Sequence, residues 1–364
     1  MTLEGEVDRI FDPSGSAGDG GQPGNSIRAA IDSKAARNES VPSWQPIPLS
    51  QLGEGAAVPW LWDGYLAVGF ITLLTGLWKA GKTTLVAHLL KLHGDGGELA
   101  GAVNPARVLV VTEENGGLWR RRRDDLGIGD HVHLVPRPFR VRPKLALWES
   151  FTLHVADLVA GSGYRLVVFD TVPSFWPVTK ENDASEVIAA LTPLHAVADA
   201  GAAVLLTHHP RKGDAGEGQA SRGSGALPGF VDVIVELRRY APGERGDRRR
   251  TLTAYSRFDE TPTEAVIELG DDGYRCVGTQ ADAKQADRLD AIPDLLPHDP
   301  PGVTAEDLLK VWPGTGPAKP GKRTLQLDLR RGTEMGRWLQ AGTGTRGDPL
   351  RYWLPDSIRA TAVS

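Results

Sequence analysis

Short apolar runs alternate with longer mixed segments between Trp44 and about Val277. Five of these runs are "FITLLTG" (70–76), "ARVLVVTEE" (106–114), "YRLVVFDT" (164–171), "AAVLLTHH" (202–209) and "VDVIVELRR" (231–239). Runs that are apolar on both faces and separated by segments of helical length are typical of central strands in a parallel sheet. The pattern therefore predicts an α/β fold in which helices flank a mostly parallel sheet.

Two further runs, 249–258 and 264–277, predict additional strands, and the second contains a "DDG" hairpin turn. The composition changes elsewhere along the chain and divides it into regions. We expect a disordered tail at 1–44, an α/β domain at 45–278, a polar linker at 279–288, a small domain at 289–355 and a tail at 356–364.

The composition limits which classes of protein this chain can belong to and which partners it can bind. The chain has 364 residues and a net charge of −5, so any contact with nucleic acid needs a local basic patch. Cys276 is the only cysteine, which excludes an internal disulfide and fits a reducing compartment. The most hydrophobic run, residues 65–78, is too short to cross a bilayer. We expect a cytoplasmic protein with no membrane partner.

The segment that follows the first apolar run fits the pattern G-x-x-x-x-G-K-[ST], between a predicted strand and a predicted helix. Glycines let backbone N–H groups surround a phosphate, and the helix N-terminus adds partial positive charge. In such a loop Lys82 reaches the β- and γ-phosphates, and the Thr83 hydroxyl ligates Mg²⁺. ATP and Mg²⁺ are the expected cofactors. The candidate nucleotide-binding residues are Gly76, Lys79, Ala80, Gly81, Lys82, Thr83, Thr84 and Asp170.

Carboxylates follow two other predicted strands. Asp170 ends "LVVFD", where a Walker B aspartate would organise the metal together with Thr83. Glu113 and Glu114 end the strand of "VLVVTEEN", at the edge where ligands bind in open α/β sheets. One of the two glutamates could act as general base on the attacking water. The pair could equally be the solvated start of a helix.

Two histidines end a fourth strand, in "LLTHHPRKG". A polar side chain at this position could contact the γ-phosphate and signal its loss to the next loop. Alternatively, one of His208 and His209 is buried and hydrogen-bonded while the other is exposed.

The order of these motifs resembles that of the RecA-like ATPases, and more narrowly the RepA-type replicative helicases and related plasmid or phage ATPases. The resemblance covers about residues 45–277 and includes "PWLWDGYLAVGFITLLTGLWKAGKTTL", "THHPRKG" and "RGSGALPGFVDVIVEL". It implies that Glu114 activates water and that His208 is the γ-phosphate sensor. Lys79 departs from the small residues common at its position in the loop, and the resemblance gives it no role.

The resemblance also implies contacts with DNA and with a neighbouring subunit. The glycine-rich segment 211–225 corresponds to a loop facing the central channel of ring-shaped relatives, where Arg211, Lys212 and Arg222 could contact DNA phosphates. Arg257 occupies the position of an arginine that acts on the neighbour's nucleotide. The alternatives are a plain surface loop, and a surface arginine paired with Asp259 or Glu260.

The arginine run in "WRRRRDDLG" (119–127) could suggest a DNA-binding patch. Four consecutive arginines on a helix point in different directions, however, and two aspartates follow them. We therefore expect a helix that faces solvent or another subunit.

Residues 289–355 resemble a winged helix-turn-helix domain, with a helix near 322–334 in a DNA groove and a wing near 343–349. Thr304 and Asp307 form a pattern like a capping box at an earlier helix. The alternating Leu325, Leu327 and Leu329 locally favour a strand instead. The basic residues in the expected contact elements are Lys322, Arg323, Arg330, Arg331, Arg346 and Arg351. Such a module could bind DNA or dock a protein.

The sequence thus predicts a Mg²⁺-dependent ATPase that forms a homo-oligomeric ring, expected to be a hexamer. Its expected role is that of a helicase or translocase on single-stranded DNA in replication, with a replication or loading partner at the C-terminal module. Two alternatives remain. One is a regulatory or defence ATPase that switches without unwinding. The other is a DNA-binding regulator controlled by a nucleotide. The overall acidity mildly favours both alternatives over the motor, because strong DNA binding usually goes with basic character.

Overall fold

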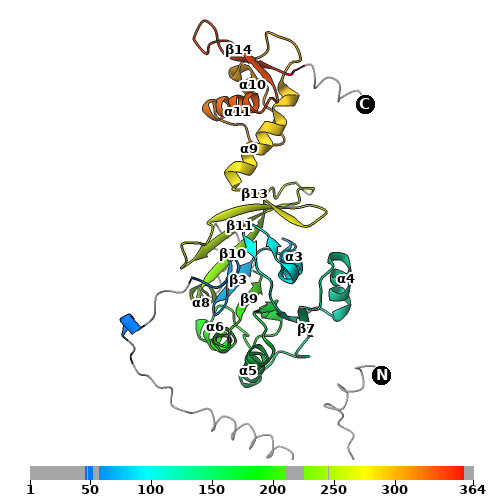
Figure 1. Cartoon of the computed structure of the whole chain (residues 1–364), viewed down its shortest axis with the longest axis vertical. Coiled ribbons are helices and arrows are strands. Elements are labelled where there is room, and N and C mark those ends of the chain that lie inside the picture. Colours follow the sequence, from blue (N-terminus) through cyan, green and yellow to red (C-terminus); the bar gives the residue numbers. More distant parts are fainter. Residues whose placement is uncertain (1–45, 47, 52–56, 210–224, 245, 356–364) are drawn as a thin grey trace, which may run out of the picture. The chain divides into compact units, whose positions relative to one another are not determined.

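The computed structural model describes residues 46, 48–51, 57–209, 225–244 and 246–355 (Figure 1). The chain divides into two units, 1–57 and 58–364. In the first unit, the described residues form one short 3₁₀ helix, η2 (Leu49–Gln51). The predicted tails 1–44 and 356–364 and the predicted DNA contacts Arg211, Lys212 and Arg222 lie outside the described residues.

A nine-stranded sheet forms the centre of the second unit in the described part of the chain. Its strands run in the order β13-β12-β11-β10-β3-β9-β8-β6-β7. From β10 to β7 all neighbours are parallel, whereas β11, β12 and β13 extend the sheet in antiparallel fashion. Each apolar run of the sequence supplies a strand, and the predicted α/β fold with a mostly parallel sheet flanked by helices is confirmed. The bounds are β3 (Ile71–Thr75), β6 (Val108–Thr112), β7 (Val132–Pro136), β8 (Leu166–Asp170), β9 (Ala203–His208), β10 (Val233–Arg239), β11 (Arg249–Ser256), β12 (Glu264–Leu269) and β13 (Tyr274–Gly278).

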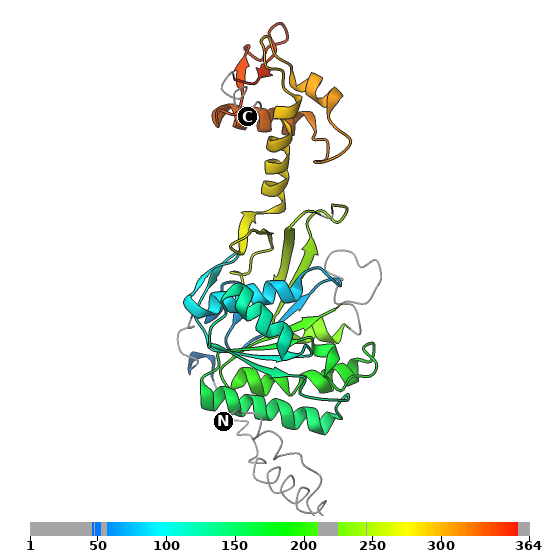
Figure 2. The same cartoon turned by 90° about the vertical axis from the view of Figure 1, so that its right-hand side faces the viewer.

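Helices cover both faces of this sheet (Figure 2). One face packs against α3 (Lys82–Asp95) and Trp119 of α4 (Gly116–Leu126). The other face packs against α5, α6, α7 and α8. The central strands are buried on both sides, which explains why they read as continuous apolar runs. The bounds on the second face are α5 (Leu145–Ser162), η3 (Val172–Ser174), α6 (Ala184–Leu191), α7 (Leu194–Asp199) and α8 (Ala226–Phe230).

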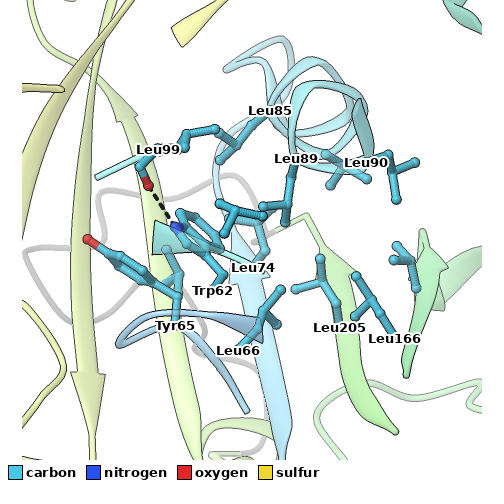
Figure 3. Close-up of a cluster of buried hydrophobic side chains, with 14 of the residues drawn as sticks. Trp62, Tyr65, Leu66, Leu74, Leu85, Leu89, Leu90, Leu99, Leu166 and Leu205 are labelled. Atoms are coloured by element: carbon cyan, nitrogen blue, oxygen red, sulfur yellow. Dashed lines mark hydrogen bonds between the residues drawn. The ribbon is translucent and has the colours of Figure 1, made fainter. Parts of the chain in front are cut away.

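A small second sheet lies next to α3, with the strand order β2-β1-β5-β4. Trp62 of this sheet is buried against Leu74, Leu85 and Leu89, and its indole N–H donates a 2.6 Å hydrogen bond to the carbonyl of Leu99 (Figure 3). The small sheet therefore completes the core around α3. Its strands are β1 (Trp60–Trp62), β2 (Leu66–Ala67), β4 (Gly97–Glu98) and β5 (Ala102–Val103).

The C-terminal part has its own hydrophobic core. The segment predicted as a linker forms most of α9 (Gln280–Ala291), which begins with a capping box between Thr279 and Asp282. The pattern at Thr304 and Asp307 is confirmed as the capping box of α10 (Ala305–Val311). A hairpin of β14 (Leu339–Ala341) and β15 (Arg351–Trp353) encloses the predicted wing tip. The remaining elements are η4 (Pro293–Leu295) and α11 (Lys322–Glu334).

The leucines of α11 resolve the conflict between helix and strand. Leu325 and Leu329 are fully buried, whereas Leu327 is 52% exposed. Residues four apart share a helix face, and the residue between them points elsewhere.

In the described residues, no helix is both long and apolar enough to span a membrane.

Candidate nucleotide-binding site

The side chains predicted to bind and hydrolyse the nucleotide, apart from Arg257, gather where the parallel strands end. Strands β3, β6, β8 and β9 are neighbours of the same direction, so their carboxyl ends lie at one edge of the sheet. Residues 76–81 turn from β3 into α3 at this edge. Such an edge is where ligands bind in open α/β sheets.

Two glycines of this turn allow its backbone conformation and its close approach to a neighbouring strand. A Cβ on Gly76 would lie 2.5 Å from the carbonyl oxygen of Leu237, so no larger residue fits there. Gly81 adopts a φ of 103° at the N-cap of α3. Lys79 has a φ of 59°, in the left-handed region that side chains other than glycine rarely enter. The loop therefore curls into the shape that exposes backbone N–H groups to a phosphate.

Lys82 is buried within the loop, at 4% exposure. Its ammonium donates to the carbonyls of Gly76 and Leu77 and lies 2.8 Å from Nδ1 of His209. Burial lowers the pKa of Lys82 to about 8, while the nearby Asp170 opposes this shift. A phosphate at this place would restore a full charge partner to the ammonium.

Asp170 ends β8 as predicted and is 2% exposed. Thr207 donates a 2.6 Å hydrogen bond to its Oδ1. Burial raises the pKa of Asp170, the bond from Thr207 opposes the rise, and the charges of Glu114 and Glu113 add to it. Added positive charge would therefore stabilise the ionised form. Carboxylate and hydroxyl oxygens are also the donors that Mg²⁺ prefers, so Asp170 and Thr83 fit this metal.

The two glutamates after β6 have different partners. Glu113 is exposed, and its carboxylate accepts a hydrogen bond from Ser174. Both oxygens of Glu114 pair with the guanidinium of Arg122, one of them at 2.9 Å. Arg122 lies 4.8 Å from the centre of the Trp119 ring. The arginine run does form the predicted helix, but Arg122 faces this site instead of solvent.

The two histidines at the end of β9 also have different surroundings. His208 is buried, with its ring 6.1 Å from that of Trp176, and burial lowers its pKa to about 4. His209 is half-buried and contacts Lys82, and its ring lies 5.9 Å from that of Trp78. The structure thus brings His209, and not His208, directly to the lysine of the loop.

Arg257 lies at the opposite edge of the sheet from its own loop. It is 70% exposed and lies 3.8 Å from Asp232, whose carboxylate accepts a hydrogen bond from the N–H of Ile71. Ile71 begins β3, whereas the loop follows the end of that strand. Five residues of strand span about 16 Å, so the guanidinium of Arg257 lies about that far from its own nucleotide site.

The predicted basic contacts of the C-terminal part lie mainly at its surface. Arg330 and Arg346 are exposed on α11 and in the β14–β15 turn. Arg331 is exposed too, but it donates to Gln285 of α9 at 3.0 Å. Five of the six predicted basic side chains are therefore exposed, and Arg351 is half-buried.

Two arginines that the sequence did not single out contact the loop directly. Arg250 of β11 donates to the carbonyl of Ala80 at 2.7 Å, and Arg239 of β10 donates to that of Lys79 at 3.2 Å. Both lie in predicted strands more than 150 residues away from the loop. The pairing of β10 with β3, and of β11 with β10, brings them there.

Comparison with known proteins agrees with this site. Residues 41–215 match the model of a protein family described as an AAA domain, a stretch that holds the loop, the glutamates, Asp170 and both histidines. The crystal structure of a KaiC-like protein from the hyperthermophilic archaeon Pyrococcus horikoshii OT3 is similar, with 18% identity and a TM-score of 0.43. That similarity covers 60% of this chain and 99% of the archaeal chain. No curated protein matches the sequence.

The loop geometry and the family match both indicate a nucleotide-binding site. A buried lysine, a buried aspartate and two further acidic residues converge at one sheet edge, within the matched residues. Together they support a nucleotide-binding ATPase.

Proposed function

We propose that the chain hydrolyses ATP with Mg²⁺ at this site and works as a ring-forming motor on single-stranded DNA. The observation that carries the first part is the buried ammonium of Lys82, held inside the loop beside His209 and near Asp170. A cation buried without a carboxylate in bonding distance is costly unless an anion binds there.

Each residue has a separate task in hydrolysis. Lys82 and the loop N–H groups bind the β- and γ-phosphates, and Asp170 with Thr83 holds the metal. Bound Mg²⁺ neutralises charge on the phosphate oxygens. Glu114 first separates from Arg122 and then takes a proton from the attacking water. His209 contacts the terminal phosphate and links it to the segment that follows β9.

Ring formation is supported by the position of Arg257. This exposed guanidinium cannot serve its own site, so a role in phosphate chemistry needs a second subunit. The C-terminal part adds support for a DNA or protein contact, because α10, α11 and the β14–β15 hairpin follow in the order of a winged helix-turn-helix. The bridge between Val303 and Tyr352 adds a third strand position to that hairpin. We propose this module as the contact for DNA or for a loading partner in replication.

A second candidate, an ATPase switch that does not unwind DNA, is favoured by the pairing of Glu114 with Arg122. A carboxylate with both oxygens bound to a guanidinium is a poor proton acceptor until the pair opens. Such a site turns over slowly until a partner rearranges it. This is the behaviour of a switch.

Steady-state ATP hydrolysis with and without single-stranded DNA tests these proposals, with Lys82→Ala as the blank. Loss of one positioned catalytic group costs a factor of about 10² or more, so the blank should show no turnover. Stimulation by DNA supports the motor. Hydrolysis that ignores DNA supports the switch. Wild-type protein as inactive as Lys82→Ala would contradict both.

A further inference from the structure

The hairpin of β10 and β11 directs two arginines at the back of the phosphate-binding loop. Arg250 donates through Nε to the carbonyl of Ala80, and its other donors hold the carbonyls of Asp247 and Arg249. Arg239 donates to the carbonyl of Lys79. The loop's outward carbonyls are therefore bound by side chains from the far end of the domain sequence.

The two arginines are also direct neighbours across the strands. Arg239 and Arg250 are paired in the antiparallel register of β10 and β11. Like charges directly opposite each other destabilise a sheet. The arrangement is reasonable only if both guanidiniums have another task, and the carbonyls of the loop provide one.

The loop needs such support because of Lys79. Its φ of 59° is in the left-handed region, where the conformational energy of a residue with a Cβ is higher than that of glycine. Each peptide unit has its carbonyl and its N–H on opposite sides. Holding the carbonyl of Ala80 outward therefore keeps the next N–H group, that of Gly81, on the opposite side, where a phosphate would bind. The N–H of Ala80 itself donates within the loop, to the carbonyl of Leu77 at 3.1 Å.

We propose that Arg250, assisted by Arg239, is a positioning residue that fixes the loop for polyphosphate binding. Neither arginine touches the phosphates in this arrangement; each acts through the loop backbone. The ligand class is a nucleoside di- or triphosphate, and the inference rests on the proposed function of this loop. Arg250 contributes more than Arg239, since its bond is shorter and its side chain is less exposed.

Binding of ADP and of an ATP analogue to the full chain tests this proposal, by calorimetry in the presence of Mg²⁺. Hydrogen bonds to charged groups are worth enough to predict that Arg250→Gln weakens both ligands about tenfold, and Arg239→Gln about threefold. Arg250→Lys keeps one donor and should recover part of the loss. Arg248→Gln is the matched control, because Arg248 is exposed and bonds to Gly270 and Asp271 instead.

A double-mutant cycle with Lys79→Gly separates positioning from a general loss of folding. Glycine adopts the left-handed conformation without support, so Arg250→Gln should weaken binding by a clearly smaller factor in that background. Equal factors in both backgrounds would overturn the positioning role. If Arg250→Gln binds as tightly as wild type while Lys82→Ala does not bind, this inference is wrong and the proposed function stands. If wild type binds no nucleotide, both are wrong.

Discussion

At the scale of single residues, the site contains two ionisable side chains whose burial disfavours their charged forms. Lys82 is buried with a lowered pKa, and Asp170 is buried with a raised one. For Lys82, burial outweighs the attraction of Asp170, and for Asp170 it outweighs the hydrogen bond from Thr207. A ligand that brings phosphate and metal together relieves both costs. The site is therefore prepared for a metal-bound polyphosphate.

The lowered pKa of Lys82 predicts how binding depends on pH. Only the charged ammonium attracts phosphate, and in the free protein this charge is lost as pH rises through about 8. The Kd for ADP should be constant below pH 7.5 and should rise towards about tenfold per pH unit above 8. Titration calorimetry between pH 7 and 9.5 measures this. Constant affinity up to pH 9.5 would show that Lys82 keeps its proton.

The pairing of Glu114 with Arg122 leads to a second prediction at this scale. Arg122→Gln frees both carboxylate oxygens, so ATP turnover without any activator should rise about threefold to tenfold. Arg121→Gln is the control, since Arg121 is exposed and pairs with Asp125. A fall in turnover would instead mean that Arg122 supports the active arrangement of Glu114.

At the scale of elements, α11 is fixed by one close contact. A Cβ on Gly332 would lie 1.8 Å from the ring of Trp338, which is fully buried and donates to the carbonyl of Leu329 at 2.8 Å. Asp328, one turn before Gly332, is buried too and pairs with Arg288 of α9 at 2.6 Å. These contacts hold α11 against both the hairpin and α9.

The contact at Gly332 predicts a strong effect of a small change. Gly332→Ala should destabilise the C-terminal part by about 1–3 kcal/mol, because the backbone of α11 or the ring of Trp338 has to move. Gly314→Ala is the control, as a Cβ there meets nothing within 4 Å. Denaturation followed by tryptophan fluorescence measures the difference, and nucleotide affinity should stay unchanged. Equal stability of the two variants would contradict this packing argument.

At the scale of the whole molecule, the position of Arg257 predicts that activity is shared between subunits. Glu114→Gln keeps Arg257 but lacks the base, and Arg257→Ala keeps the base but lacks the arginine. If subunits form a ring, each variant alone should be inactive, and an equimolar mixture should regain part of the ATP turnover at its mixed interfaces. A mixture as inactive as its components, or an active Arg257→Ala, would argue against shared sites.

The sequence by itself determined the central strands and most of the nucleotide site. The strands are short apolar runs, and the loop, Asp170 and the glutamates are local patterns beside them. Local patterns suffice because parallel strands bring their ends to one edge whatever their order. The helix at 322–334 was also expected, although the alternation of Leu325, Leu327 and Leu329 locally favoured a strand.

Only the tertiary structure decided which side chains meet. Arg250 and Arg239 reach the loop because β10 pairs with β3, a contact between residues about 160 positions apart. Adjacent residues of a strand point to opposite faces, but which face carries the ligand depends on how the helices pack. That choice gave His209 the contact with Lys82 and buried His208, and it turned Arg122 towards Glu114. Register and packing are long-range properties, which no local pattern contains.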